Sequence, residues 1–121
     1  MEDPLYKDLI IEHFRNPRNR GHLECPDCSA HVKSPTCGDE LRVTIGLEDD
    51  RITAICFEGQ GCAISQASAS IASDAYIGLT LRAILELHED WVTQLLGGPV
   101  SRSRRSCASL HLMAVKQALR G

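Results

Sequence analysis

Two runs of alternating apolar and polar residues, joined by a short acidic turn, constrain the fold more than any other feature of the sequence. Apolar residues occupy every second position of LRVTIGL (41–47), and RITAICFEG (51–59) alternates again. Alternation with a period of two is typical of strands that bury one face. Because only EDD (48–50) separates the two runs, they predict a β-hairpin. The segment AHVK (30–33) predicts a third, short strand.

Helical spacing replaces this alternation in the rest of the chain. Small residues at helical spacing over 62–76 predict a helix that can lie close to a sheet or to another helix. Residues 79–98 predict one broken helix or two short ones, and residues 106–121 predict a last amphipathic helix after a basic linker. A first helix is expected to open near Tyr6 and to stop before Pro17. This order of elements predicts an α+β fold, and 121 residues suit a single domain over 1–121.

Charge and composition argue against several classes of protein. A net charge of −3 gives no electrostatic reason to expect binding to nucleic acid or to a membrane surface. No apolar run approaches the roughly 18 residues that a membrane span needs, and the first ten residues lack the core of a signal peptide. We therefore expect a cytoplasmic protein, in which the six cysteines stay reduced and serve metal or sulfur chemistry rather than disulfides.

Three of the cysteines fall where regular structure is expected to begin. Cys37 precedes a strand, Cys62 starts a helix, and Cys107 is expected at the start of the last helix. Helix N-termini favour a thiolate over a thiol, and the thiolate is the form that binds metals or attacks sulfur. Asp39 adds a carboxylate beside Cys37, so the set offers four ligands, enough for tetrahedral zinc or for the edge of an iron–sulfur cluster.

The glycines next to these residues support the same interpretation. Gly38 and Gly61 are expected to adopt positive φ angles and to keep side-chain bulk away from a ligand. The spacing alone leaves the question open, because the separations of 25 and 45 residues match no short metal motif. The alternative is three unrelated, partly buried cysteines.

Four segments together resemble a known family. LYKDLIIEHFRNPRNRG, PTCGDE, FEGQGCAISQASAS and SCASL occur in this order over nearly the whole chain. They resemble the U-type iron–sulfur cluster assembly proteins, which comprise SufU, IscU and the N-terminal domain of NifU, and look closest to the SufU branch. The resemblance implies a SufU/IscU-like fold, with an N-terminal helix, a three-stranded antiparallel sheet and several helices packed on it.

The resemblance also implies a site and its chemistry. Cys37, Asp39, Cys62 and Cys107 would converge, bind zinc, and accept sulfur or a transient 2Fe–2S cluster, with Cys37 as the expected sulfur acceptor. The implied partners are a cysteine desulfurase of the SufS/IscS type and downstream cluster carriers or apo-proteins. The chain would not be an enzyme by itself, although it could act as a sulfurtransferase with its desulfurase.

The chain combines features of two branches of this family. It lacks a segment that SufU proteins carry between the second and third cysteines, and Ser106 stands where IscU has a histidine. Two roles therefore remain open, a zinc-bound sulfur acceptor and a cluster scaffold. Two further alternatives come from other classes: a binding module with a purely structural zinc ion, and a thiol-redox protein that uses Cys25 and Cys28.

The remaining cysteines and one histidine have competing interpretations. Cys25 and Cys28 form a C-x-x-C sequence near His31, but the spacing and context match neither a zinc knuckle nor a thioredoxin site, which favours loop residues. Cys56 is expected to pack in the core. His111 lies four residues after Cys107, which would place both on one helical face. His111 could add a ligand or instead point to solvent or to a neighbouring helix, and the family places no ligand there.

Overall fold

The computed structural model describes residues 4–34, 38–98 and 100–120. The chain forms α1 (Pro4–Arg15), β1 (Cys28–Lys33), β2 (Glu40–Glu48), β3 (Arg51–Gln60), α2 (Ala63–Tyr76), α3 (Leu81–Leu85), α4 (Glu89–Leu96), α5 (Arg102–Ala108) and α6 (Leu110–Arg120). The α+β order expected from the sequence is confirmed, and residues 79–98 contain two short helices.

The three strands form one antiparallel sheet in the order β1-β2-β3. The β2–β3 hairpin is regular until a bulge between Gly46 and Leu47, where Gly46 pairs with Ala54 but Leu47 pairs with Ile52. The bulge changes the phase of β3, so Ile52 and Ile55 are both buried although they are three residues apart. Cys56 alternates with buried Ile55 and Phe57, and it is only half-buried. The prediction that Cys56 packs in the core is therefore wrong.

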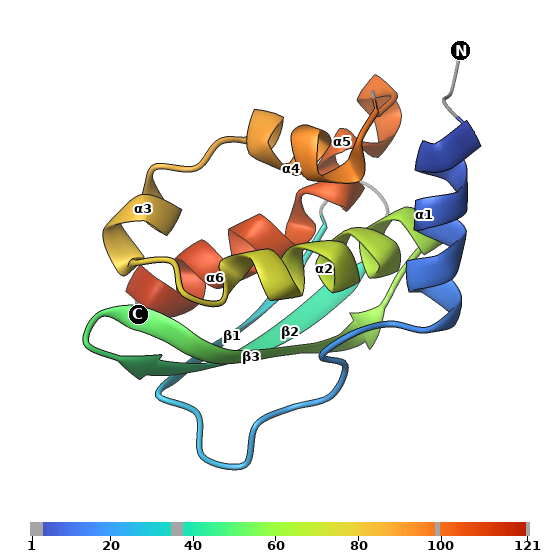
Figure 1. The fold of residues 1–121 in the computed structure, drawn as a ribbon. Helices are drawn as coiled ribbons and strands as arrows, with labels where there is room; N and C mark the ends of the chain where they lie inside the picture. The colour runs from blue at the N-terminus through green and yellow to red at the C-terminus, as the bar shows by residue number, and fades with distance from the viewer. Residues whose placement is uncertain (1–3, 35–37, 99, 121) are drawn as a thin grey trace.

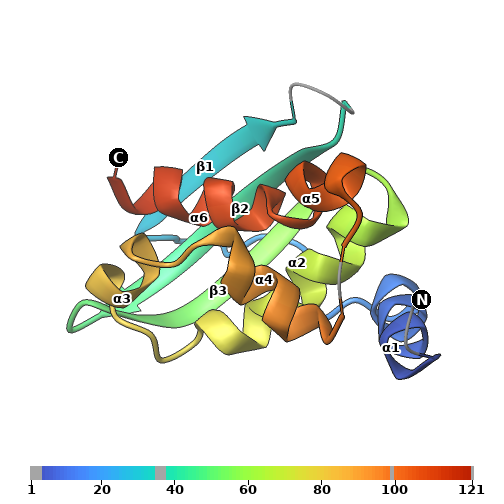
Figure 2. The same cartoon turned by 90° about the horizontal axis from the view of Figure 1, so that it is seen from above.

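Helices cover one face of this sheet (Figures 1 and 2). The central helix α2 contacts β3 and also α1, α4, α5 and α6. Its small side chains permit this close packing, and helix residues such as Ala67, Ala69 and Ala72 are almost fully buried. Buried Tyr76 at its end contacts Trp91 of α4, with ring centroids 5.1 Å apart. The short connection from β3 puts the start of α2 beside the end of β3 and the start of β2.

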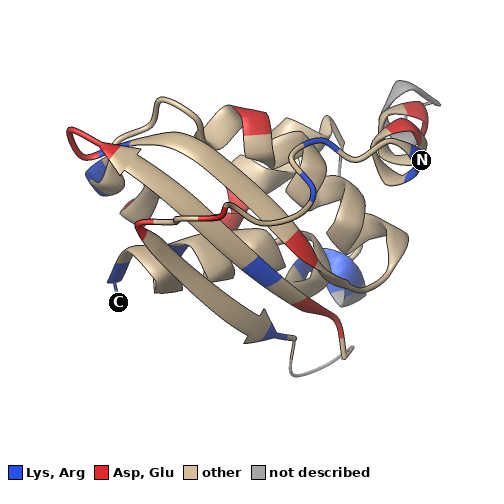
Figure 3. Cartoon of the chain, turned by 90° about the horizontal axis from the view of Figure 1, so that it is seen from below, with Lys and Arg blue, Asp and Glu red and all other residues tan. Residues whose placement is uncertain are grey.

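The opposite face of the sheet is crossed by the connector of residues 16–27 and carries charges of both signs (Figure 3). His22 lies 3.5 Å from Glu58, and Lys33 lies 3.8 Å from Glu40. These side chains are largely exposed or partly exposed, so the pairs contribute little to stability. No helix among the described residues is long and apolar enough to cross a membrane.

The C-terminal region differs from the expected single helix. Residues 102–105, expected in the basic linker, are helical and form α5 together with residues 106–108, and a break at Ser109 separates α5 from α6. Arg and Ser residues carry no apolar periodicity, so the pattern gave no signal for α5. Because of the break, Cys107 lies near the end of α5 and not at the start of the last helix.

Candidate metal centre

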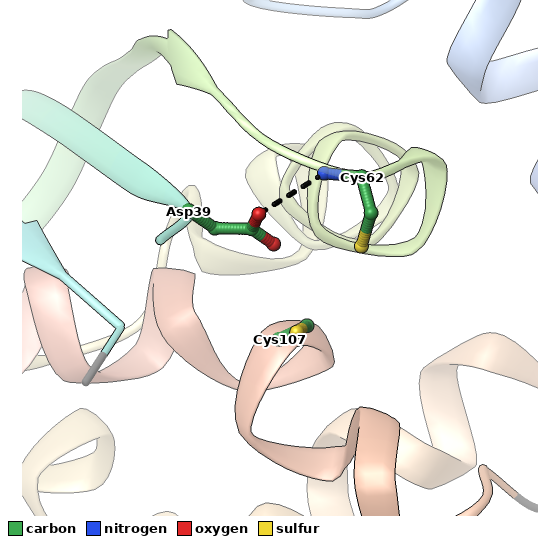
Figure 4. A group of neighbouring side chains, drawn as sticks. All are labelled: Asp39, Cys62 and Cys107. Carbon is green, nitrogen blue, oxygen red and sulfur yellow. Dashed lines mark hydrogen bonds between the residues drawn. The ribbon is translucent and has the colours of Figure 1, made fainter. Parts of the chain in front are cut away.

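Three of the four expected ligands converge at one end of the sheet, where β2 begins (Figure 4). Asp39 lies directly before β2, Cys62 caps the start of α2, and Cys107 belongs to α5. One oxygen of the carboxylate and the two sulfurs all lie within 4.8 Å of one another. Among the residues that the structure describes, this is the one group of three Cys, His, Asp or Glu side chains that could hold a metal ion. Cys37 lies outside the described residues.

Backbone contacts hold Asp39 in this position. Its side chain is 6% exposed, and Oδ1 accepts a hydrogen bond from the backbone N–H of Cys62, with 3.3 Å between the atoms. The backbone N–H of Ser34 donates to the carbonyl oxygen of Asp39 over 2.7 Å. A buried carboxylate is costly unless polar or cationic groups face it, so its position beside two thiols suits a cation-binding site.

Gly61 leaves the space that the carboxylate occupies. A Cβ atom added at Gly61 would lie 2.8 Å from Cγ of Asp39 and 2.4 Å from Oγ of Ser65, both too close for real atoms. The expectation that Gly61 keeps bulk away from the site agrees with this geometry. The expectation of a positive φ is confirmed for Gly38, at +73°. It is wrong for Gly61, whose φ is not positive.

The two cysteines have different backbone settings. Cys62 has extended backbone angles, precedes the first turn of α2 and is half-buried. The predicted position of Cys62 at the start of a helix is therefore confirmed. Cys107 is 4% exposed and lies near the end of α5, so the prediction that a helix N-terminus activates its thiol is wrong.

The donor set fits a thiophilic metal. Ligand atoms on tetrahedral zinc lie about 3.3–3.8 Å apart, so separations of up to 4.8 Å need only small side-chain rotations. Two thiolates and a carboxylate suit zinc or iron, and they leave one position for a fourth ligand.

His111 does not join the site. It is fully buried, and its ring nitrogens bind Tyr76 and Ser68 of α2. The break at Ser109 puts Cys107 and His111 on separate helices, so the prediction that they share a helical face is wrong. The alternative, that His111 points to a neighbouring helix, is correct. Sequence reasoning missed Ser68, whose buried hydroxyl contacts both His111 and α5; a polar residue on a stripe of small residues was the available signal.

The C-x-x-C sequence is not part of any cluster of ligands within the described residues. Cys25 is exposed, and Cys28 opens β1, half-buried against the core. Burial, with the nearby charge of Asp27, raises the pKa of the Cys28 thiol, which disfavours the thiolate needed for metal binding or redox exchange. His31 lies 3.8 Å from Glu40 on the exposed face.

The chain is similar in sequence and structure to several known proteins. A scaffold protein of Archaeoglobus fulgidus, named iron–sulfur cluster assembly scaffold protein IscU 1, is 35% identical over 115 residues, which are 95% of this chain and 74% of that protein. The zinc-dependent sulfurtransferase SufU of Bacillus subtilis is 37% identical over 95 residues, 78% of this chain but 64% of its own length. The crystal structure of the N-terminal part of a nitrogen-fixing NifU-like protein from Brucella abortus superimposes with a TM-score of 0.78 at 26% identity, covering 95% of this chain and 92% of that one.

The family comparison covers almost the whole chain. The family described as NifU-like N terminal domain matches residues 5–121, which include all four expected ligands. The fold, the convergence of Asp39, Cys62 and Cys107, and this match agree, and the chain belongs to the NifU-like N-terminal domain family.

Proposed function

We propose that the protein takes part in iron–sulfur cluster assembly by accepting sulfur from a cysteine desulfurase at the site of Asp39, Cys62 and Cys107. The observation that carries this proposal is the convergence of two thiols and a buried carboxylate from three separate elements. The names of its relatives support it, since one is called a cluster assembly scaffold and another a zinc-dependent sulfurtransferase.

Cys37 is the fourth ligand in this proposal and the first sulfur acceptor. It precedes Asp39 by two residues in the sequence, and the family resemblance assigns it both roles. Zinc bound by these residues would keep the thiolates deprotonated and protect them from oxidation. The structure supports this donor set through the three ligands that it describes.

The proposed sulfur transfer is a thiol–persulfide exchange without net oxidation. The thiolate of the accepting cysteine attacks the terminal sulfur of a persulfide on the desulfurase. A new S–S bond forms on this protein, the S–S bond on the desulfurase breaks, and the desulfurase cysteine leaves as a thiolate. No additional base is needed, because the nucleophile is already deprotonated and the leaving group needs no proton.

A 2Fe–2S cluster is the cargo that the same ligands would hold in the scaffold role. A carboxylate is a hard, weak ligand for such a cluster compared with a thiolate, so Asp39 favours release of the cluster to carriers or apo-proteins. The chain would then work as an acceptor or scaffold, with sulfurtransferase activity only together with its desulfurase.

The partner would meet a basic segment beside the thiols. Arg104 and Arg105 are exposed on α5 and precede Cys107. An acidic surface around the desulfurase active site would complement them. Cytoplasmic localisation, and the absence of nucleic-acid and membrane partners, stay predictions.

Sulfur transfer can be tested directly. The protein is incubated with a cysteine desulfurase and free cysteine, and peptide mass spectrometry locates any added sulfur. We expect the sulfur at Cys37, Cys62 or Cys107, with a strong loss in the Cys37→Ser variant. Cys25→Ser is the matched control and should behave as the wild type. If sulfur is absent from all three positions, or if Cys25→Ser abolishes the transfer, the proposal is wrong.

Iron addition separates the two roles. Under anaerobic conditions, a scaffold acquires the visible absorption of a 2Fe–2S cluster after iron and a thiol reductant, which reduces persulfide sulfur to sulfide, are added to the same mixture. A protein that acts only as an acceptor gains persulfide but stays colourless.

A further inference from the structure

A chain of buried hydrogen bonds joins the helices that carry the two described thiols. Tyr76 and Ser68 lie on α2 and His111 lies on α6, and their side chains are at most 1% exposed. Tyr76 Oη lies 2.8 Å from His111 Nδ1, and His111 Nε2 lies 2.9 Å from Ser68 Oγ. Ser68 Oγ in turn lies 2.7 Å from the carbonyl oxygen of Ala108.

The chemistry of the groups fixes the direction of every bond. A carbonyl oxygen only accepts, so the Ser68 hydroxyl donates its single hydrogen to Ala108. Ser68 Oγ must then accept from Nε2–H of His111, which leaves Nδ1 to accept from the Tyr76 hydroxyl. Burial lowers the pKa of His111 to about 3 and raises the pKa of Tyr76 well above its ordinary value, so both groups stay neutral. The chain therefore has one arrangement of hydrogens and rigidifies the contact between the helices.

One end of this chain is next to Cys107, and the helix that carries Ser68 begins directly after Cys62. Ala108 directly follows Cys107 and is the last residue of α5, where helix carbonyls lack partners within the helix. At the start of α2, in a separate contact, Ser65 Oγ donates to the carbonyl oxygen of Cys62 over 3.1 Å. Helix α2 thus binds backbone carbonyls at Cys62 and beside Cys107.

We propose that His111 is a positioning residue for the metal centre, which acts through Ser68 on the backbone beside Cys107. The proposal rests on the proposed function, because it assumes that Cys62 and Cys107 serve one site. Cys62 and Cys107 belong to different helices, so their spacing in the sequence does not fix the distance between the two sulfurs. The hydrogen-bond chain fixes this distance by attaching the end of α5 to the middle of α2.

Two buried serines of α2 offer a matched test. Ser73 is also fully buried, donates to the carbonyl oxygen of Ser70 over 2.7 Å and accepts from Asn19 Nδ2 over 2.8 Å. Within the described part of the chain it makes no hydrogen bond to α5 or α6. We compare Ser68→Ala with Ser73→Ala, because both remove one buried hydroxyl from the same helix. Zinc affinity is measured by competition with a chromophoric chelator, and ligand geometry by the visible spectrum of the Co²⁺-substituted protein.

We expect Ser68→Ala to bind zinc about tenfold more weakly and to change the Co²⁺ spectrum, as losses of hydrogen bonds that orient metal ligands do. Ser73→Ala should match the wild type in both measurements. Equal effects of the two substitutions would overturn the proposal, because they would show general destabilisation. His111→Gln keeps an N–H that can reach Ser68 and should recover part of the affinity that His111→Leu loses.

A measurement on the metal-free protein separates this proposal from the proposed function. In a Cys37→Ser background, diamide oxidises Cys62 and Cys107 to a disulfide, and peptide mapping follows the rate, which depends on the separation of the two sulfurs. We expect severalfold slower formation with Ser68→Ala than with Ser73→Ala. If the wild type binds no zinc but this difference in rate remains, the proposed metal site is wrong, and the role of the hydrogen-bond chain in positioning the two thiols is supported. If the rates are equal, the positioning role fails whatever the protein binds.

Discussion

Asp39 can occupy its position only because the residue before Cys62 has no side chain. A Cβ atom at Gly61 would overlap with the carboxylate and with Ser65. The requirement at this residue is therefore steric and not conformational, since its φ is not positive. A glycine that faces a ligand set can thus be part of the site without contributing a ligand.

Gly61→Ala should weaken the metal site more than it destabilises the fold. The added methyl group must displace the Asp39 carboxylate, so we expect zinc affinity to fall at least about tenfold, with a stability loss of about 1–3 kcal/mol for the overpacked site. Chelator competition and urea unfolding measure the two quantities. The control is Gly46→Ala, whose Cβ would meet its nearest atoms at 3.5 Å or more. Unchanged zinc binding in Gly61→Ala would contradict this account of the site.

His111 illustrates what the sequence could and could not predict at this scale. Its spacing from Cys107 suggested a shared face, but this inference required one continuous helix. The break at Ser109 turns the imidazole toward α2, and there it is buried beside Tyr76 with ring centroids 5.7 Å apart. A local sequence pattern does not reveal such a break, because it depends on packing against another element.

Burial of His111 predicts a specific loss of stability in acid. The folded state keeps the pKa of His111 near 3, whereas the unfolded chain has the ordinary value near 6.5. Between these values the unfolded state binds more protons, so the contribution is complete above about pH 6.5 and falls as the pH falls toward 3. We expect His111 to account for about 2 kcal/mol of lost unfolding free energy between pH 7 and pH 5.

Urea unfolding of the metal-free, reduced protein at the two pH values measures this loss. The His111→Leu variant is the comparison, because it lacks the titrating group but keeps His13, whose pKa burial also lowers. The variant should lose about 2 kcal/mol less than the wild type over this range. Equal losses in both proteins would show that His111 is protonated in the folded state.

At the level of elements, the connector between α1 and β1 ties three parts of the fold together. Asn19 Nδ2 donates to Ser73 and Asp74 of α2, over 2.8 and 2.9 Å. The carbonyl oxygen of Asn19 accepts from the backbone N–H of Phe57 in β3, over 2.9 Å. Asn19 has a left-handed φ of 55°, a conformation that asparagine tolerates better than most residues.

Asn19→Ala should therefore cost about 2 kcal/mol of stability, from backbone strain and two lost hydrogen bonds. Chemical unfolding of the metal-free protein measures this change. Asn16→Ala is the matched control, since Asn16 follows α1 directly and is exposed. Among the described residues its side chain bonds only to Glu12 of α1, over 3.5 Å. A loss below about 0.5 kcal/mol for Asn19→Ala would indicate that the connector does not hold these elements together.

The strength of the local signal decided which elements the sequence could predict. The hairpin and α2 follow clear periods of apolar or small residues, and both were predicted close to their observed bounds. Helix α5 consists mainly of Arg and Ser and has no such period. The bulge in β2–β3 inverts the alternation near Ala54, a change that arises from pairing and not from the residue types of one strand.

At the level of the whole molecule, the metal centre links segments that are distant in the sequence. Asp39 lies before β2, Cys62 at the start of α2 and Cys107 in α5, and no short spacing connects them. Only the family resemblance predicted their convergence, because members of a family share a tertiary structure, which the spacing of residues in the sequence does not reveal. The apolar core cluster lies between the sheet and the helices and includes none of these three ligands.

This separation of core and site predicts a folded metal-free protein that zinc stabilises further. Apolar residues from the sheet and from helices α1 to α6 form one buried cluster, so the reduced, EDTA-treated protein should keep its helical circular dichroism and unfold cooperatively. Free zinc at about 100 times its dissociation constant should then raise the free energy of unfolding by about 2.7 kcal/mol. The double variant Cys62→Ser/Cys107→Ser is the control and should show the metal-free stability but little response to zinc. A metal-free wild type that is unfolded would instead favour a purely structural zinc ion, since such domains fold only with their metal.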